Sequence, residues 1–177
     1  MDQETRRAQH RSVVIICAFV FLVYLGNSLW LSLFPNYLLR QGMNSLLIGA
    51  VLMTYNASLS LTFLPSGRLS DRLGRRPLML TGSILLALSA FSLSLVNQVE
   101  TRTVAVIGAG IGLALLVPSG NALISDIVSG RGSGSIFAIY QISTLSAAVV
   151  GSFTAGALAE SMGFSRMFLL SALLLAA

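Results

Sequence analysis

Apolar residues fall into six long runs separated by short polar segments. The runs cover about residues 13–39, 45–66, 78–96, 103–124, 135–159 and 167–177. Each of the first five reaches the ~20 residues that a helix needs to cross about 30 Å of hydrocarbon. In lipid every backbone polar group must be satisfied within the segment, which favours helices over strands. The pattern predicts an all-α membrane protein with six transmembrane helices, the last one truncated.

Basic residues precede the first run and set the expected orientation. The run exceeds the 7–15 apolar residues typical of a signal peptide and lacks a clear cleavage site, so we interpret it as a retained helix. We expect residues 1–12 to form a cytoplasmic N-terminus and residues 13–177 to form one transmembrane bundle in the cell membrane. The positive-inside rule supports this orientation with eight arginines inside and three outside. The inside set is Arg6, Arg7, Arg11, Arg68, Arg72, Arg75, Arg76 and Arg131, and the outside set is Arg40, Arg102 and Arg166.

Composition narrows the class further. The chain is 55% hydrophobic and 10% charged, whereas a soluble domain carries about 25% charged residues. The net charge of +5 resides in arginines between the apolar runs, which favours membrane lipid over nucleic acid as a partner. The sequence has no metal-binding Cys/His spacing, and the glycines of segment 130–134 lack the lysine of a phosphate-binding loop. We therefore expect no enzyme activity, no cofactor and no metal.

A weak internal repeat appears when the sequence is shifted by 89 positions. The shift places Gly67, Leu69, Asp71, Leu73 and Gly74 on Gly156, Leu158, Glu160, Met162 and Gly163. Three helices separate the copies, so the copies enter the membrane from opposite sides. This is the 3+3 inverted repeat found in many transporters.

Small residues recur at every fourth position in two of the predicted helices, which places them on one helix face. The stripes are Ala50, Thr54, Ser58, Thr62 and Ser66, and Ser143, Ala147, Gly151, Ala155 and Ala159. Such stripes let another helix approach closely. They indicate either packing within this bundle or sliding contact with a partner half, and we favour the partner half because equivalent helices carry both stripes.

The segment Gly-Arg-Leu-Ser-Asp-Arg-Leu-Gly-Arg-Arg-Pro over residues 67–77 resembles the signature loop of the major facilitator superfamily. We expect Pro65 and Gly67 to close the second helix and Gly74 to form a tight turn. The resemblance implies the N-terminal six-helix half of a twelve-helix fold. It also implies a conformational lock on the cytoplasmic side, with Asp126 either a partner of its arginines or a solvated charge. The implied lock residues are Gly67, Asp71, Arg72, Gly74, Arg75, Arg76 and Asp126.

Two departures from the family pattern concern drug efflux. Members often carry an arginine within the fourth helix, whereas here Arg102 is expected at its outer edge and Val104 occupies the arginine position. The fifth-helix pattern of drug–proton antiporters keeps its outer glycines, Gly151 and Gly156, but lacks the proline.

Polar residues in the middle of the runs are candidates for a substrate cavity, since substrates bind near the midplane of such folds. Each could instead form hydrogen bonds between helices. We assign Trp30 and Tyr37 to an outer aromatic belt. The candidate cavity residues are Tyr24, Asn27, Ser28, Tyr55, Asn56, Asn121, Tyr140 and Gln141.

These observations predict transmembrane transport of a small organic solute by alternating access, with secondary active efflux preferred. Uptake of a sugar or organic acid is the main alternative. The second alternative is a non-transporting membrane module or a half-transporter. The expected partners are a C-terminal six-helix half or a second copy of this chain.

Overall fold

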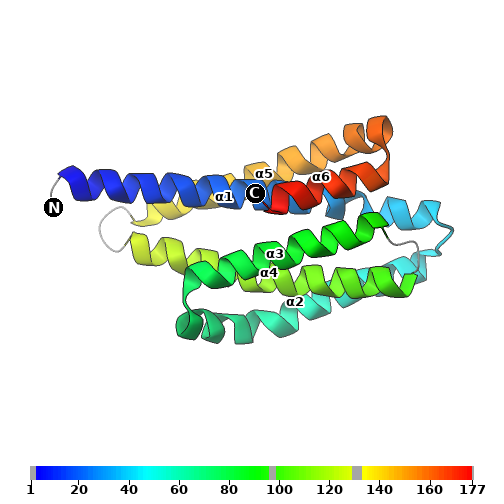
Figure 1. Ribbon diagram of the computed structural model, residues 1–177, viewed down its shortest axis with the longest axis horizontal. Helices are drawn as coiled ribbons and strands as arrows, with labels where there is room; N and C mark the ends of the chain where they lie inside the picture. Colours follow the sequence, from blue (N-terminus) through cyan, green and yellow to red (C-terminus); the bar gives the residue numbers. More distant parts are fainter. Residues whose placement is uncertain (1–2, 96–98, 129–132, 177) are drawn as a thin grey trace.

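The computed structural model describes residues 3–95, 99–128 and 133–176, and all of the regular structure in them is helical (Figure 1). Five of the helices are long and apolar enough to cross a membrane. The prediction of an all-helical protein with six helices is confirmed. The helices are α1 (Gln3–Arg40), α2 (Ser45–Leu73), α3 (Arg75–Leu95), α4 (Val99–Ile127), α5 (Ser133–Met162) and the shorter α6 (Phe164–Ala176).

The helices lie lengthwise beside one another in two groups (Figure 1). Helix α1 packs along α5 and α6, α4 packs along α2 and α3, and the contact between α3 and α6 joins the groups. The start of α1 and the α2–α3 junction at Gly74 lie at one end of the bundle, and the α5–α6 junction at Gly163 lies at the other (Figure 1). We call these the Gly74 end and the Gly163 end.

Most helices extend beyond the predicted runs. Helix α1 begins at Gln3, about ten residues before the apolar run, because residues 3–12 contain no Gly or Pro and favour the helix. Helix α2 continues past Ser66 to Leu73. Hydropathy identifies only the apolar part of a helix, so it does not predict the polar extensions.

The expectation that Pro65 and Gly67 end the second helix is wrong. Pro65 lies inside α2, and most of the signature segment is therefore helical. Proline is tolerated within membrane helices because neighbouring groups satisfy the freed backbone carbonyls. Only Gly74 breaks the chain direction: it has a φ of +95° and its N–H donates to the Ser70 carbonyl.

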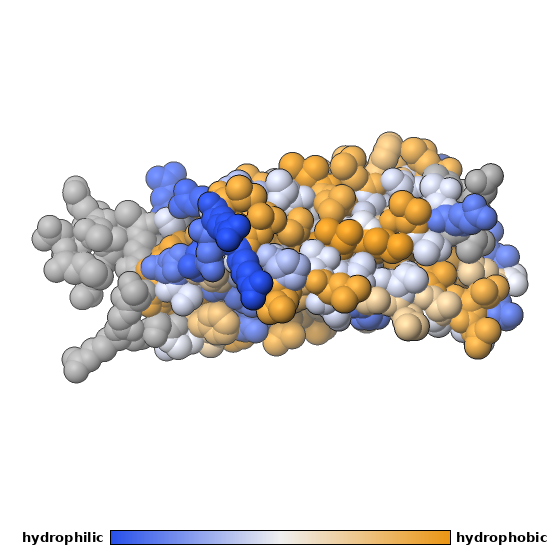
Figure 2. Space-filling model, turned by 90° about the horizontal axis from the view of Figure 1, so that it is seen from below, coloured by the Kyte–Doolittle hydropathy of each residue, from blue (hydrophilic) through white to orange (hydrophobic). Residues whose placement is uncertain are grey.

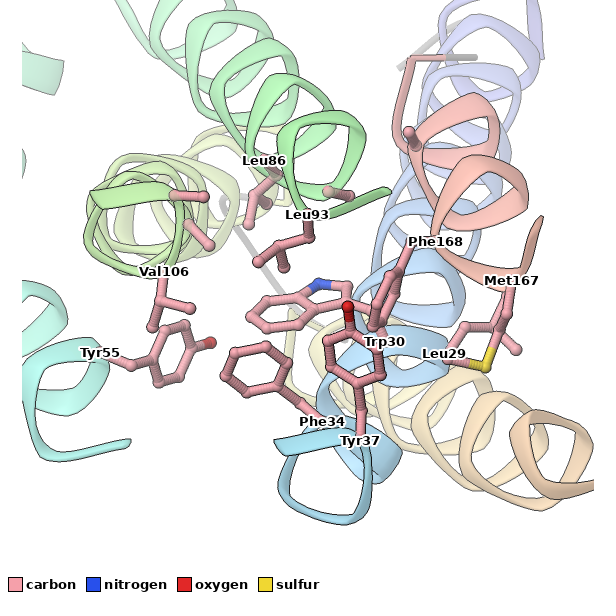
Figure 3. Close-up of a cluster of buried hydrophobic side chains, with 14 of the residues drawn as sticks. Leu29, Trp30, Phe34, Tyr37, Tyr55, Leu86, Leu93, Val106, Met167 and Phe168 are labelled. Atoms are coloured by element: carbon pink, nitrogen blue, oxygen red, sulfur yellow. The ribbon is translucent and has the colours of Figure 1, made fainter. Parts of the chain in front are cut away.

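Aromatic side chains fill the centre of the core near the Gly163 end (Figure 3). Trp30 is fully buried and meets Phe34 and Tyr55 edge to face, with ring centroids 5.6 and 6.0 Å apart. Tyr37 is also buried and contacts Phe168. The assignment of Trp30 and Tyr37 to an outer aromatic belt is therefore wrong, because both rings face the helices of this bundle.

The stripes of small residues pack within this bundle. A Cβ atom added at Gly110 of α4 would meet the Ser58 hydroxyl and, at 2.6 Å, the Tyr55 carbonyl oxygen of α2. On α5, a Cβ atom at Gly151 would lie 2.8 Å from the Leu25 carbonyl oxygen of α1. The preferred interpretation, sliding contact with a partner half, is wrong for these contacts. The close approaches that small residues permit join α2 to α4 and α5 to α1.

On the face shown in Figure 2, apolar side chains predominate between more hydrophilic regions towards the two ends. Helices α2 and α5 are the least covered of the long helices, with 17% and 22% of their most apolar windows buried against 39–50% for the others. Apolar side chains at this exposure require lipid or another protein surface.

Candidate functional site

The signature segment forms the junction between α2 and α3 at the Gly74 end. The last turn of α2 carries Asp71 and Arg72, and α3 begins directly at Arg75. Gly74 is the single residue between the helices. A positive φ is costly for residues with a Cβ atom, which explains a glycine at this position.

Arg75 is the centre of the charged junction. Its Nε lies 2.8 Å from Oδ2 of Asp126 in α4, and a terminal guanidinium nitrogen lies 3.7 Å from Oδ1 of Asp71 in α2. The side chain of Arg75 is 27% exposed, against 55% for Asp126 and 71% for Asp71. One guanidinium thus connects three helices. Asp126 was expected to be either a partner of the arginines or a solvated charge, and in the structure it contacts Arg75.

The remaining members of the predicted lock lie at the surface. Asp71, Arg72 and Arg76 are exposed. Arg76 also borders a cavity of about 410 Å³ whose other walls are mostly apolar. Beyond the adjacent residues and backbone of α2 itself, no described atom lies within 4 Å of a Cβ atom built on Gly67, so packing within this bundle does not require a glycine there.

The predicted cavity residues do not share one surface. Asn27, Ser28, Tyr55 and Tyr140 are buried within this bundle, Tyr24 and Asn121 are half-buried, and Asn56 and Gln141 are exposed. The Asn56 amide donates to the Leu52 carbonyl of its own helix at 2.9 Å. Asn27 lies beside the Tyr55 hydroxyl, but among the described residues neither the Asn27 oxygen nor that hydroxyl has a partner with hydrogen-bond geometry. Only the exposed and half-buried members are accessible from outside the bundle.

The burial of Arg102 near the Gly163 end was not predicted from the sequence. Arg102 was expected at the outer edge of the fourth helix, but it lies within α4 and is 2% exposed. It donates a 2.8 Å hydrogen bond to the Tyr37 hydroxyl. Val104, the expected arginine position, faces outward at 68% exposure. The sequence did contain one signal for this buried site: the spacing of Trp30, Phe34 and Tyr37 places three rings on one helix face.

The geometry defines a helical integral membrane protein with a charged junction at one end of the bundle. The family model described as "Major Facilitator Superfamily" matches residues 16–177 of this chain. The chain belongs to this family of membrane transporters, which confirms the resemblance seen in the signature segment.

Three curated relatives illustrate the similarity. The chain is 26% identical to the multidrug transporter MdfA of Edwardsiella piscicida over 96% of its own length and 42% of that protein. It is 35% identical to the MFS-type transporter ppzB of Metarhizium rileyi, covering 72% of this chain and 26% of the relative. It is 30% identical to a chloramphenicol resistance protein of Pseudomonas aeruginosa, covering 74% and 31%. The chain thus spans less than half the length of each relative.

Solved structures share the fold. A peptide transporter POT in complex with sulfate superposes with a TM-score of 0.84 at 17% identity, over 93% of this chain and 35% of the other. A POT family transporter in complex with 5-aminolevulinic acid gives 0.81 at 19% identity, over 94% and 36%. At these identities the likeness concerns the fold alone.

Proposed function

We propose that this chain is the N-terminal six-helix half of an alternating-access transporter for a small organic solute. The observation that carries the proposal is the position of Arg75, which holds Asp71 of the signature segment and Asp126 of α4 at the junction of three helices. Alternating access is largely rigid-body rocking of one half against the other, and the Asp71 carboxylate, 71% exposed, remains available for contact with the second half. In this proposal the junction is the cytoplasmic lock, and Arg72 and Arg76 bind anionic lipid.

The proposed 3+3 inverted repeat has support at both ends of the bundle. Gly74 and Gly163, which are 89 residues apart, both have a positive φ. Their N–H groups donate to the carbonyls of Ser70 and Ala159, again 89 residues apart. Exchange of α1 with α4, α2 with α5 and α3 with α6 also preserves the main packing: α1 with α5 becomes α4 with α2, and α1 with α6 becomes α4 with α3.

The proposed orientation places the Gly74 end in the cytoplasm. Most of the described arginines lie at that end, whereas Arg40, Arg102 and Arg166 lie towards the Gly163 end, a bias expected of cytoplasmic segments. Arg131, which the sequence analysis counted as cytoplasmic, lies outside the described residues. The proposed partner is a second six-helix half, because the relatives are more than twice as long. The poorly covered faces of α2 and α5 are the surfaces available to it.

Efflux is the proposed direction, because relatives are named for multidrug transport and chloramphenicol resistance. Among the predicted cavity residues, Asn56 and Gln141 are exposed to a solute, and Tyr24 and Asn121 are half-buried. Their uncharged donors and acceptors suit a neutral or weakly polar molecule.

Vesicle transport tests the proposal. Inside-out vesicles that contain the protein should accumulate labelled chloramphenicol against its gradient if the protein exports it, and right-side-out vesicles should do so if it imports it. Arg75→Gln should slow accumulation in either case, whereas Arg166→Gln, an exposed arginine at the Gly163 end, should not. Equal movement in vesicles with and without the protein, for chloramphenicol and for a panel of sugars, organic acids and dipeptides, would contradict transport.

A further inference from the structure

A cavity of about 400 Å³ lies at the Gly163 end, between the ends of α1, α5 and α6. Its charged and polar walls are Asn36 and Arg40 of α1 and Glu160 of α5. Phe164 at the start of α6 also lines it. None of these residues belongs to the lock or to the predicted substrate cavity.

The two charges in this cavity have opposite signs but do not pair. The guanidinium of Arg40 lies over the Phe164 ring, 5.2 Å from its centroid, a cation–π contact that fixes its position. Among the described residues, no nitrogen of Arg40 lies within 4.0 Å of a carboxylate oxygen of Glu160. A cation and an anion held apart on one cavity are complementary to a ligand that carries both charges.

An exposed aromatic side chain follows the cavity along α5. Phe153 lies three residues before Gly156 and seven before Glu160, on the same face of α5, and it is 85% exposed. Phe153 lies further from the Gly163 end than Glu160 does. A ligand that matches this order has a charged head and hydrocarbon chains that extend towards the bilayer centre.

We infer that this cavity binds the headgroup of a phospholipid with a primary amine, such as phosphatidylethanolamine. The phosphate lies against the Arg40 guanidinium with Asn36 as a second donor, and the ammonium donates to Glu160. A primary ammonium has hydrogen-bond donors for the carboxylate, whereas a choline headgroup has none. The apolar surface below the cavity favours the lipid over a soluble zwitterion. This site is separate from the proposed lock and does not depend on transport.

Native mass spectrometry of the purified protein tests the site. We compare retention of phosphatidylethanolamine, phosphatidylcholine and phosphatidylglycerol with identical acyl chains. The expected result is a preference of roughly tenfold for phosphatidylethanolamine. Glu160→Gln should remove this preference and leave phosphatidylglycerol binding unchanged, whereas Arg40→Gln should weaken binding of both lipids.

Matched controls exist at the same end of the bundle. Glu100→Gln and Arg166→Gln remove the same charges from exposed positions that do not line the cavity, and both should retain the preference. Equal retention of the three lipids by the unaltered protein would overturn the inference without any variant. Competition by soluble glycerophosphoethanolamine as strong as that by the whole lipid would overturn the assignment to a lipid and indicate a soluble zwitterion.

Discussion

Arg102 and Tyr37 form a buried cation–phenol contact between α4 and α1. The guanidinium donates a 2.8 Å hydrogen bond to the Tyr37 hydroxyl, and its carbon lies 4.8 Å from the ring centroid. Tyr37 in turn packs against Phe164 and Phe168 of α6. The contact therefore links three helices near the Gly163 end, opposite the three helices that Arg75 connects.

The Tyr37 hydroxyl should contribute to stability. Tyr37→Phe keeps the ring and removes the acceptor of a hydrogen bond from a charged group, so the free energy of unfolding should fall by about 1.5–3 kcal/mol. The matched control is Tyr55→Phe, because the Tyr55 hydroxyl is buried and has no hydrogen-bond partner in the described part of the chain, so its removal should be neutral or stabilising. Unfolding in mixed detergent micelles measures both. Equal losses for the two variants would contradict this role of the hydrogen bond.

Gly112 should not tolerate alanine. A Cβ atom there would lie 2.8 Å from the Gly82 carbonyl oxygen and 3.0 Å from the Leu86 backbone nitrogen. Gly112→Ala should therefore cost about 1–3 kcal/mol of unfolding free energy. The control Gly49→Ala lies in α2 with no atom within 4 Å of the added carbon, and there the higher helix propensity of alanine should stabilise the protein slightly. A thermal melt of each purified variant gives the comparison, and a melting temperature of Gly112→Ala at or above that of Gly49→Ala would rule out this packing.

The two carboxylates around Arg75 should differ in strength. The contact with Asp126 is 2.8 Å long, whereas that with Asp71 is 3.7 Å and involves the more exposed group. Double-mutant cycles with Arg75→Gln should give a coupling energy of about 0.5–1 kcal/mol with Asp126→Asn and near zero with Asp71→Asn. The coupling with Asp126 should decrease at high salt. A larger coupling with Asp71 would show that the resting state of the junction differs from this structure.

Positions related by the shift of 89 should be accessible from opposite sides of the membrane. Cys17 is the single cysteine, so Cys17→Ser provides a background for labelling. In it, Ser161→Cys should react with an impermeant maleimide on intact cells, and Arg72→Cys should react only after permeabilisation. Both positions are exposed in the bundle, which makes them a matched pair. Labelling of both from the same side would contradict the inverted repeat.

Local patterns predict the helices well because membrane insertion depends on length and hydropathy, which a sequence states directly. The charged junction could also be predicted from the sequence, since the signature segment fixes Gly74 and places Arg75 at a helix start. The helix ends could not be predicted, because Pro65 and Gly67 break helices in water but are tolerated in this bundle.

The burial of individual side chains was harder to predict from the sequence than the positions of the helices. Trp30 and Tyr37 have the composition of an interface belt, and only the positions of α4 and α6 show that they face inward. The stripe through Ser58 and Thr62 showed that a helix approaches closely but could not identify it, because spacing specifies a face and not the neighbour. The polar residues of the predicted cavity failed for the same reason: helical spacing alone did not separate buried Tyr140 from exposed Gln141.

The glycine contact between α3 and α4 has a mechanical consequence. A Cβ atom on Gly82 would lie 2.7 Å from the Gly112 carbonyl oxygen, so the two backbones meet without an intervening side chain. Side chains that change rotamer absorb small displacements between helices, but a backbone contact has no such slack. A displacement of α3 at Arg75 would therefore pass to α4 at this contact with little loss.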